Sequence, residues 1–290
     1  YSVPEWICRL WCGAYGMEKT IRILDAIGHP PAMTLTVNTL KTTPSALLAD
    51  LIQNGIPAKK GILTENSIRL TSSLPLEKLA AWEGQYFVQD EASALCAALV
   101  GAMPGETVLD ACACPGGKSF GMAISMQNEG TLLALDLHKN KLSLIEKGAA
   151  ALGIRMIQTG VQNASVPRED MPSFDRILCD VPCSGLGVLA KKPDIRYKPE
   201  SEIQRLPTLQ YRILETNAGY LKPGGTLVYS TCTLNPAENE DIAVRFLKEH
   251  PDFSLCPFKH GRICSNGICE IFPYEYGTDG FFIAKFKRNG

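Results

Sequence analysis

An apolar run that ends in a glycine turn is the feature that most constrains this chain. Residues 108–119 read V-L-D-A-C-A-C-P-G-G-K-S. The run ends at Asp110, a Pro-Gly-Gly turn follows, and Lys118 and Ser119 open a predicted helix. Glycine lets a ligand approach the backbone, and a helix N-terminus attracts negative charge. A strand, a glycine turn and a helix in this order therefore predict a cofactor site.

Two phosphate-binding patterns do not fit this turn. A Walker A loop needs a glycine five residues before Gly117, and Cys112 stands there. The dinucleotide fingerprint needs three spaced glycines, whereas the turn offers only Gly116 and Gly117. Two interpretations remain: a site for a smaller anion, such as the carboxylate of an amino-acid moiety, and a plain strand-to-helix turn.

Strand-like and helix-like segments alternate from this turn to the end of the chain. Strands are expected at residues 107–110, 131–136, 155–160, 175–180, 226–230 and 281–286, and helices from the turn to about 126 and at 139–152, 202–221 and 237–249. This order predicts an α/β fold with a doubly wound, mostly parallel sheet that binds ligands at the carboxyl ends of its strands. Asp110, Asp136, Asp180 and Ser230 stand at such ends, although a single aspartate there is often only a cap or turn former.

The position of Asp136 suggests the kind of cofactor. It lies 19 residues beyond Gly117, close to the offset at which an acidic side chain binds the hydroxyls of a ribose. A ribose at Asp136 and a charged tail at the glycine turn together describe a nucleoside cofactor. S-adenosylmethionine fits, because it has a ribose and a carboxylate but no phosphate that needs a lysine cradle.

Residues 1–86 predict a helical and small α+β domain ahead of a main domain at 87–290. The expected elements are two short helices within 4–27, a strand at 33–38, a helix at 45–53, a strand or hairpin at 62–70 and a helix at 85–100 that enters the main domain. Lys59 and Lys60 lie beside the expected hairpin. A small sheet-and-helix unit with exposed lysines could dock RNA, and a structural cap is the alternative.

The net charge and the number of cysteines indicate which binding partners and which cellular compartment to expect. The formal net charge is -1, so binding to a nucleic acid requires a local patch. Eleven cysteines, an odd number, suit a reducing cytoplasm better than a disulfide scaffold. We expect neither a metal nor a membrane partner, because the paired cysteines lack CxxC spacing and no apolar run reaches ~20 residues. We also expect a monomer and, since the chain begins at Tyr1 rather than Met, a processed piece.

Two cysteines stand at the ends of expected strands. Cys183 follows the strand that ends at Asp180, and Cys232 follows the strand that ends at Ser230. If these strands are neighbours, both thiols face the cofactor edge. A buried cysteine is usually inert, whereas a thiol in a strand-end loop can have a lowered pKa and act as a nucleophile. A thiolate that adds to carbon 6 of cytosine would make carbon 5 able to accept a methyl group.

Several motifs spread over nearly the whole chain resemble those of one family. Beside the cofactor turn they are Y-S-V-P-E-W from Tyr1, V-N-T-L-K from Val37, Q-D-E-A-S from Gln89, D-V-P-C-S-G-L-G-V from Asp180, K-P-D-I-R-Y from Lys192, Y-S-T-C-T from Tyr229 and G-T-D-G-F-F from Gly277. By these the chain resembles the Nop/Sun family of S-adenosylmethionine-dependent RNA cytosine-5 methyltransferases. The resemblance is greatest to the bacterial Sun/Fmu type, which acts on 16S ribosomal RNA.

The resemblance implies a Rossmann-like methyltransferase sheet and a role for each motif. Cys232 would be the nucleophile, Cys183 the thiol that helps the product break free, and Asp180 the residue that binds the cytosine edge and contacts the cofactor. The residues that would hold S-adenosylmethionine are Cys112, Ala113, Cys114, Pro115, Gly116, Gly117, Lys118, Asp136, Asn163 and Asp180.

Three departures from the family pattern stand out. Asn163 replaces an aspartate that usually lies near the adenine, and its side-chain carbonyl can still accept a bond from the adenine amino group, so we expect weakened binding. Val181 replaces the alanine of the usual Asp-Ala-Pro-Cys motif, which is a small change. Sun/Fmu-type proteins also carry an upstream helical RNA-binding domain that this sequence does not include, so we expect incomplete RNA affinity.

Four cations follow the Cys183 loop and are expected to clamp RNA phosphates. They are Lys191, Lys192, Arg196 and Lys198. The alternative is a solvated loop with scattered charge. Two rival functions are a catalytically idle RNA-binding or ribosome-assembly factor on the same fold, and a DNA cytosine-5 methyltransferase that uses Cys183 as its nucleophile. The presence of both thiols and most of the cofactor motif argues against the idle factor.

Overall fold

A central eight-stranded sheet organises the molecule, of which the computed structural model describes residues 1–29, 31–72 and 74–290. Its parallel part has the order β9-β8-β5-β6-β7, with β5 at Thr107–Asp110, β6 at Thr131–Asp136, β7 at Ile157–Val161, β8 at Phe174–Asp180 and β9 at Leu221–Thr231. Antiparallel strands extend the β9 edge. There β14 (Phe281–Arg288) pairs with β9, and β10 (Phe253–Leu255) and β13 (Ile268–Ile271) pair with β14. The expected mostly parallel sheet is confirmed.

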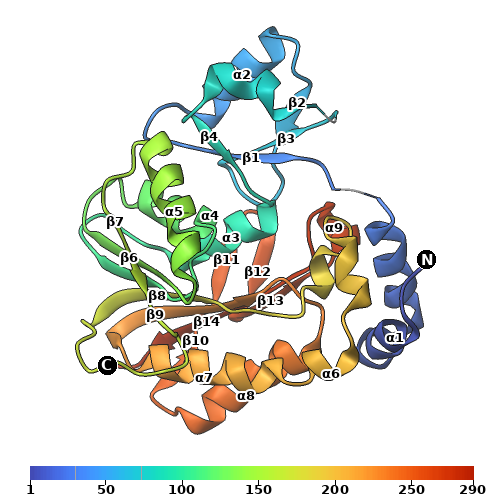
Figure 1. Cartoon of the computed structure of the whole chain (residues 1–290), viewed down its shortest axis with the longest axis vertical. Helices are drawn as coiled ribbons and strands as arrows, with labels where there is room; N and C mark the ends of the chain where they lie inside the picture. The colour runs from blue at the N-terminus through green and yellow to red at the C-terminus, as the bar shows by residue number, and fades with distance from the viewer. Residues whose placement is uncertain (30, 73) are drawn as a thin grey trace.

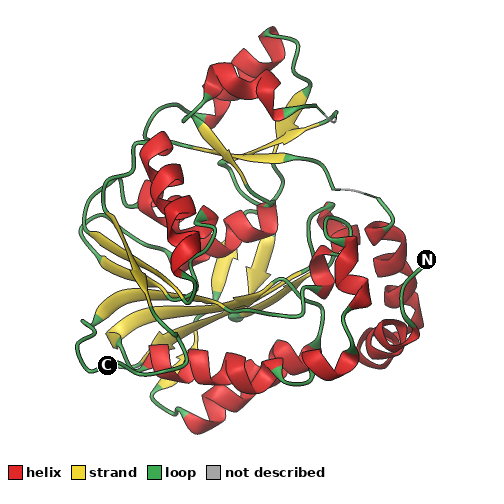
Figure 2. Cartoon of the chain, viewed as in Figure 1, coloured by secondary structure: helices red, strands yellow, loops and turns green. Residues whose placement is uncertain are grey.

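Helices cover both faces of this sheet (Figures 1 and 2). One face carries α3 (Glu91–Val100), α4 (Gly117–Ser125) and α5 (Lys139–Leu152), and the other carries α7 (Leu206–Ala218) and α8 (Glu240–Glu249). Each face of the sheet packs against its helices in a separate hydrophobic core, and successive side chains of β8 point alternately into these two cores. Leu178 packs with the first group of helices, and Ile177 and Cys179 pack with the second. A parallel strand buried on both faces reads as a continuous apolar run, and the doubly wound arrangement follows from it.

The differences from the expected main-domain elements lie mostly in its second half, although β7 also begins at Ile157 rather than at residue 155. The helix expected at 202–221 divides into α6 (Glu200–Ile203) and α7, and β9 begins at Leu221 rather than at residue 226. The helix expected at 237–249 is preceded by the 3-10 turn η4 (Pro236–Glu238). The hairpin of β11 (Phe258–His260) and β12 (Ile263–Ser265), the strands β10 and β13, and the helix α9 (Pro273–Tyr276) add to the expected elements. Elements of three or four residues carry too little periodicity to be recognised from sequence.

A second, four-stranded antiparallel sheet has the order β2-β3-β1-β4 and lies beside the main sheet's α3–α5 side (Figure 1). Its elements are β1 (Thr34–Val37), α2 (Pro44–Gln53), β2 (Ala58–Lys60), β3 (Ser67–Leu70), η1 (Leu76–Trp82) and β4 (Tyr86–Val88). The strand or hairpin expected at 62–70 is the hairpin of β2 and β3, which pair antiparallel, although it begins at Ala58 and its second strand only at Ser67. The helix expected to open at Gln85 is wrong at its start, because that segment forms β4 instead. The helix α3 starts at Glu91 because Asp90 Oδ1 accepts a bond from the Ala92 N–H at 2.9 Å.

The helix α1 (Glu5–Ile27) ties the first residues to the main domain. Gly16 has φ 79° and ψ 165°, which interrupts the helix and confirms the two short helices expected there. Trp11 is fully buried with Leu186 and Leu189 of the segment after β8, and its indole N–H donates to the Leu234 carbonyl at 2.9 Å. This helix therefore supports the loops that follow β8 and β9. No helix within the described ranges is long and apolar enough to cross a membrane.

Candidate active site

One cavity of about 420 Å³ lies at the carboxyl ends of the parallel strands. The loops after β5, β6, β7, β8 and β9 all contribute to its lining, which brings together the sequence-predicted residues Cys112, Cys114, Asp136, Asn163, Asp180, Cys183, Lys192, Lys198 and Cys232. The other predicted residues, all of them described by the structure, stand outside this lining: Ala113, Pro115, Gly116, Gly117, Lys118, Lys191 and Arg196. The cavity therefore joins the cofactor turn to both thiol loops.

The glycine turn between β5 and α4 is held against the end of β6. Gly116 has φ 113°, a conformation that favours glycine, and a Cβ there would collide with the ring of Phe120. The Cys114 N–H donates to Asp136 Oδ2 at 3.2 Å, and the His138 N–H donates to Asp136 Oδ1 at 2.9 Å. Both carboxylate oxygens of Asp136 are thereby fixed beside the turn, where they retain lone pairs for further donors.

Asp180 connects the turn to the strand that precedes Cys232. Its Oδ2 accepts from Lys118 Nζ at 2.6 Å, and its Oδ1 accepts from Ser230 Oγ at 2.7 Å. Burial opposes the charge of Lys118, but the Asp180 carboxylate outweighs it and raises the pKa of the lysine above its ordinary value. Lys118 is therefore a charged member of the site and not a solvated first-turn lysine.

The two thiols of the cavity that stand at strand ends are in contact. Cys183 Sγ lies 3.2 Å from Cys232 Sγ, and β8 and β9 are paired neighbours, as the sequence predicts. The bond with Cys183 lowers the pKa of Cys232 and outweighs burial and the Asp180 carboxylate, which both raise it, while Lys118 adds a smaller lowering effect. The bond with Cys232 and burial raise the pKa of Cys183. These directions make Cys232 the more acidic thiol of the pair, and either sulfur can be the donor of the 3.2 Å contact.

Comparison with known proteins identifies the family. The family model described as 16S rRNA methyltransferase RsmB/F matches residues 97–287, and the model of the RsmF/B-like ferredoxin-like domain matches residues 3–77. The chain belongs to the RsmB/F family of 16S rRNA methyltransferases.

Relatives and solved structures agree with this assignment. A probable ribosomal RNA small subunit methyltransferase B of Bacillus subtilis is 40% identical over 299 residues, which cover 100% of this chain and 67% of the relative. A second protein of that name, from Synechocystis, is 34% identical with 99% and 67% covered. The crystal structure of a methyltransferase homologue from Pyrococcus horikoshii matches with a TM-score of 0.86 and 29% identity over 99% of this chain and 96% of that one. The chain thus spans about two thirds of the curated relatives, and the sheet is of the Rossmann-like methyltransferase type.

A buried carboxylate that the sequence reasoning missed supports the thiol loops of this RsmB/F family member. Glu238 is fully buried, and its Oε2 accepts from the Ser184 N–H at 2.9 Å and from Gln210 Nε2 at 2.8 Å. Its Oε1 accepts from Asn235 Nδ2 at 2.8 Å. A bond of 2.6 Å between Ser184 Oγ and Thr233 Oγ1 joins the residues that follow the two cysteines. An acidic residue six positions after Cys232 was the available signal.

The end of the cavity near β7 contains the predicted Asn163. Its Oδ1 already accepts from the Ser165 N–H at 3.1 Å and from Ser165 Oγ at 2.8 Å, so this carbonyl holds its own turn. Leu137, which the sequence reasoning also missed, lines the same end and is 56% exposed. An exposed leucine directly after Asp136 gives the cavity an apolar face beside that carboxylate.

The four predicted RNA contacts divide into different surroundings. Lys192 and Lys198 line the cavity. Arg196 is half-buried and donates to the Ser2 carbonyl at 3.3 Å. Lys191 lies 2.8 Å from Asp90 Oδ2 and 2.8 Å from Asp279 Oδ2. Because two carboxylates already hold it, Lys191 is not comparable with the other three as a phosphate ligand.

Proposed function

We propose that this protein transfers a methyl group from S-adenosylmethionine to carbon 5 of a cytosine in 16S ribosomal RNA, through a covalent adduct at Cys232. The observation that carries the proposal is the contact of the two thiols, 3.2 Å apart, in one cavity with the cofactor turn. The relatives are named ribosomal RNA small subunit methyltransferase B, which supports the choice of RNA.

The residues around the glycine turn fit S-adenosylmethionine. Cys112 and Cys114 of the turn line the cavity, and Gly116 caps the N-terminus of α4 just beyond them, which suits an amino-acid carboxylate near that helix end. Asp136 would accept from the ribose hydroxyls, Leu137 would cover the adenine, and Asn163 would lie at the adenine edge. When bound there, the cofactor supplies the methyl group.

Cys232 performs the attack in this proposal. Its Sγ forms a bond with carbon 6 of the cytosine, and the electron pair of the 5,6 double bond moves to carbon 5, which takes the methyl group. The proton at carbon 5 then passes to solvent, its electron pair re-forms the 5,6 double bond, and Cys232 Sγ leaves carbon 6 as the thiolate with the pair of the broken bond. Cys183 assists this release from 3.2 Å away, and Asp180 binds the cytosine edge.

The RNA would contact both parts of the chain. We propose residues 1–86 as the RNA-binding part and 87–290 as the methyltransferase part, with the small sheet itself continuing to Val88 in β4. Lys192 and Lys198 would contact phosphates beside the target base, since they line the cavity, and Arg196 would follow them at its margin. The target cytosine must leave its stack to reach the thiols, as in other base-modifying enzymes.

Two variants test the roles of the thiols. Cys232→Ala removes the attacking sulfur, so it should bind RNA but form no adduct and transfer no methyl group. Cys183→Ala should still attack and methylate, then accumulate as a protein–RNA covalent complex. Denaturing electrophoresis with labelled RNA detects the complex, and Cys264→Ala, which changes an exposed thiol, is the control. A band from Cys232→Ala and none from Cys183→Ala would assign the attack to Cys183, as in the DNA enzymes.

The cofactor part has its own test. Asp136→Ala should weaken the binding of S-adenosylmethionine by about 1.5–3 kcal/mol, the range for a hydrogen bond to a charged group. Isothermal calorimetry measures this without RNA. Asp194→Ala removes an exposed carboxylate outside the cavity and should leave the affinity unchanged. Equal affinities for Asp136→Ala and wild type would remove Asp136 from the cofactor site.

A further inference from the structure

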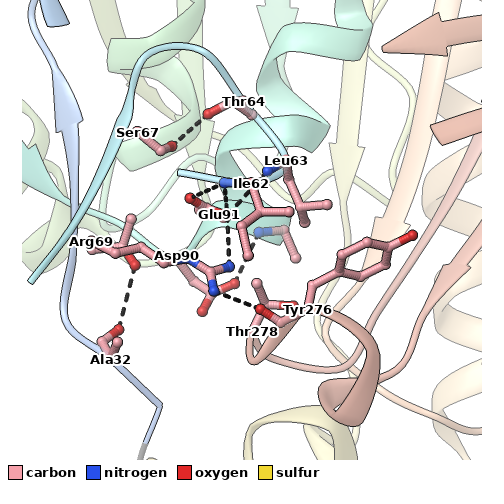
Figure 3. A network of polar contacts seen from close by, with 12 residues as sticks. Ala32, Ile62, Leu63, Thr64, Ser67, Arg69, Asp90, Glu91, Tyr276 and Thr278 are labelled. Atoms are coloured by element: carbon pink, nitrogen blue, oxygen red, sulfur yellow. Dashed lines mark hydrogen bonds and ion pairs between the residues drawn. The ribbon is translucent and has the colours of Figure 1, made fainter. Parts of the chain in front are cut away.

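Lys191 joins three segments that are far apart in the sequence. It follows the Cys183 loop, while Asp90 stands at the start of α3 and Asp279 in the turn before β14. Its Nζ lies 2.8 Å from a carboxylate oxygen of each. The Asp279 N–H also donates to Asp90 Oδ2 at 3.2 Å. Figure 3 shows Asp90 beside Glu91, close to the turn that carries Thr278.

The same turn reaches Cys232 through a second route. The Gly280 N–H donates to the Gly187 carbonyl at 2.8 Å, and the Gly187 N–H donates to the Cys232 carbonyl at 3.0 Å. A Cβ on Gly187 would collide with the carbonyl oxygen of Gly280, so the backbone of Gly187 is enclosed between Gly280 and Cys232. The position of the turn at Asp279 and Gly280 therefore determines the contact between the Gly187 N–H and the Cys232 carbonyl.

The bridge needs its cation. The side chains of Asp90 and Asp279 are 8% and 10% exposed, whereas that of Lys191 is 37% exposed. Two nearly buried carboxylates repel each other, and burial together with Asp90 raises the pKa of Asp279 to about 6. Without Lys191 no cation would stand between the two ionised carboxylates, and their repulsion would separate them and displace the turn.

We propose that Lys191 is a positioning residue. Its bridge between Asp90 and Asp279 fixes the turn that holds the backbone of Gly187 against Cys232, and it thereby sets the contact between the two thiols. The proposal rests on the proposed function only for its consequence in methyl transfer. Its geometric part concerns the free protein. It also separates Lys191 from Lys192, which lines the cavity and has no ion pair with any residue that the structure describes.

The test compares two neighbouring lysines by two measurements. The first is the rate at which iodoacetamide alkylates Cys232 at pH 7 in the RNA-free protein, followed by peptide mass spectrometry. The second is the salt dependence of binding to poly(C). Lys191→Met should lower the alkylation rate by roughly threefold or more, because loss of the Cys183 contact reduces the thiolate fraction, and leave the salt slope unchanged. Lys192→Met should reduce the slope by roughly 0.7. Lys248→Met, which changes an exposed lysine of α8 outside the cavity lining, should leave both measurements unchanged.

Further variants guard against trivial loss of fold. Lys191→Arg keeps a cation between the carboxylates and should recover at least half of the alkylation rate. Asp279→Asn weakens the bridge from its other end with little change of shape, and should lower alkylation in the same direction if Lys191→Met does not fold. Thermal unfolding identifies any variant that has merely lost its fold.

The outcomes divide cleanly. An unchanged alkylation rate in folded Lys191→Met overturns the proposal. A smaller salt slope in Lys191→Met also overturns it, whatever the alkylation rate, because the lysine then contacts phosphate. If wild-type protein transfers no methyl group to 16S ribosomal RNA while the alkylation pattern holds, the proposed function fails and the positioning role stands.

Discussion

Asp110 is a buried carboxyl at the end of β5, beside the cofactor turn. It is 1% exposed, and its Oδ2 accepts from Ser119 Oγ at 2.6 Å. Its Oδ1 has no hydrogen-bond partner among the residues that the structure describes. Burial raises the pKa of Asp110 to about 7, against the bond from Ser119, which lowers it. The folded protein therefore retains a proton that the unfolded chain releases near pH 4.

This retained proton gives a prediction with a definite sign. Stability from Asp110 is fully present below about pH 4 and is lost as the pH rises through about 7. Asp110→Asn cannot ionise, so its melting temperature relative to wild type should rise between pH 5 and pH 8, by about 2–4 °C for each kcal/mol. Scanning calorimetry at several pH values measures the difference.

Asp175 provides the control of opposite sign. Burial raises its pKa, but the Thr107 N–H and Lys222 outweigh burial, so the pKa of Asp175 is lowered overall. Its stabilisation is present at neutral pH and is lost as the pH falls. Asp175→Asn should therefore be less stable than wild type at pH 8 and approach it in acid. A pH-independent difference between Asp110→Asn and wild type would mean that Asp110 is ionised throughout.

At the scale of single residues, the sequence allowed prediction of those site residues that belong to a local motif. Asp136, Cys183 and Cys232 could be selected because each stands at the end of a recognisable strand. The pairing of Lys191 could not, since Asp90 and Asp279 are 101 and 88 residues away and nothing local marks them as its partners. A lysine after a catalytic-type loop resembles a phosphate contact until the tertiary structure shows what holds it.

At the scale of elements, strong periodicity was sufficient and short segments were not. The bounds of β5, β6 and α5 are those expected from sequence, because each is a complete buried strand or amphipathic helix. The segment of β4 was wrongly predicted as the start of a helix, because its three residues have no periodicity of their own and directly precede the helix that Asp90 caps. Its identity as a strand depends on pairing with β1, which is a tertiary effect.

The short turn η4 supports a prediction at this scale. Glu238 accepts three hydrogen bonds, from the Ser184 N–H, Gln210 and Asn235. In Glu238→Gln an amide NH₂ must face at least one of these donors. An unsatisfied buried group costs about 1–3 kcal/mol, so the variant should lose that much stability in urea unfolding and transfer methyl groups more slowly.

The cofactor affinity separates this effect from general damage. Glu238 contacts the Cys183 loop and α7, not the glycine turn, so the affinity for S-adenosylmethionine should remain that of wild type. Glu240→Gln alters an exposed carboxylate two residues away. It should leave the stability, the rate of methyl transfer and the cofactor affinity as they are in wild type. Weakened cofactor binding in Glu238→Gln would show that η4 and the cofactor turn are coupled.

At the scale of the whole molecule, a buried ion pair joins the small sheet to the main one (Figure 3). Arg69 of β3 lies 2.7 Å from Glu91 Oε2 at the start of α3, with the two side chains 7% and 0% exposed. Glu91 also accepts from the Ile62 N–H at 3.0 Å and the Leu63 N–H at 3.2 Å, and Arg69 donates to the Tyr276 carbonyl at 2.6 Å. The pair thus connects three separate segments.

We predict that breaking this pair loosens the small sheet before the main one. Arg69→Met leaves the Glu91 carboxylate buried without its cation, which costs about 3–5 kcal/mol. Amide hydrogen exchange should then accelerate by roughly 100-fold or more in β1–β4, while the parallel strands β5, β6 and β8 retain their protection. In the double variant Arg69→Met with Glu91→Gln no uncompensated charge remains, so exchange in β1–β4 should return most of the way to wild type. Equal acceleration in both sheets would show instead that they unfold as one unit.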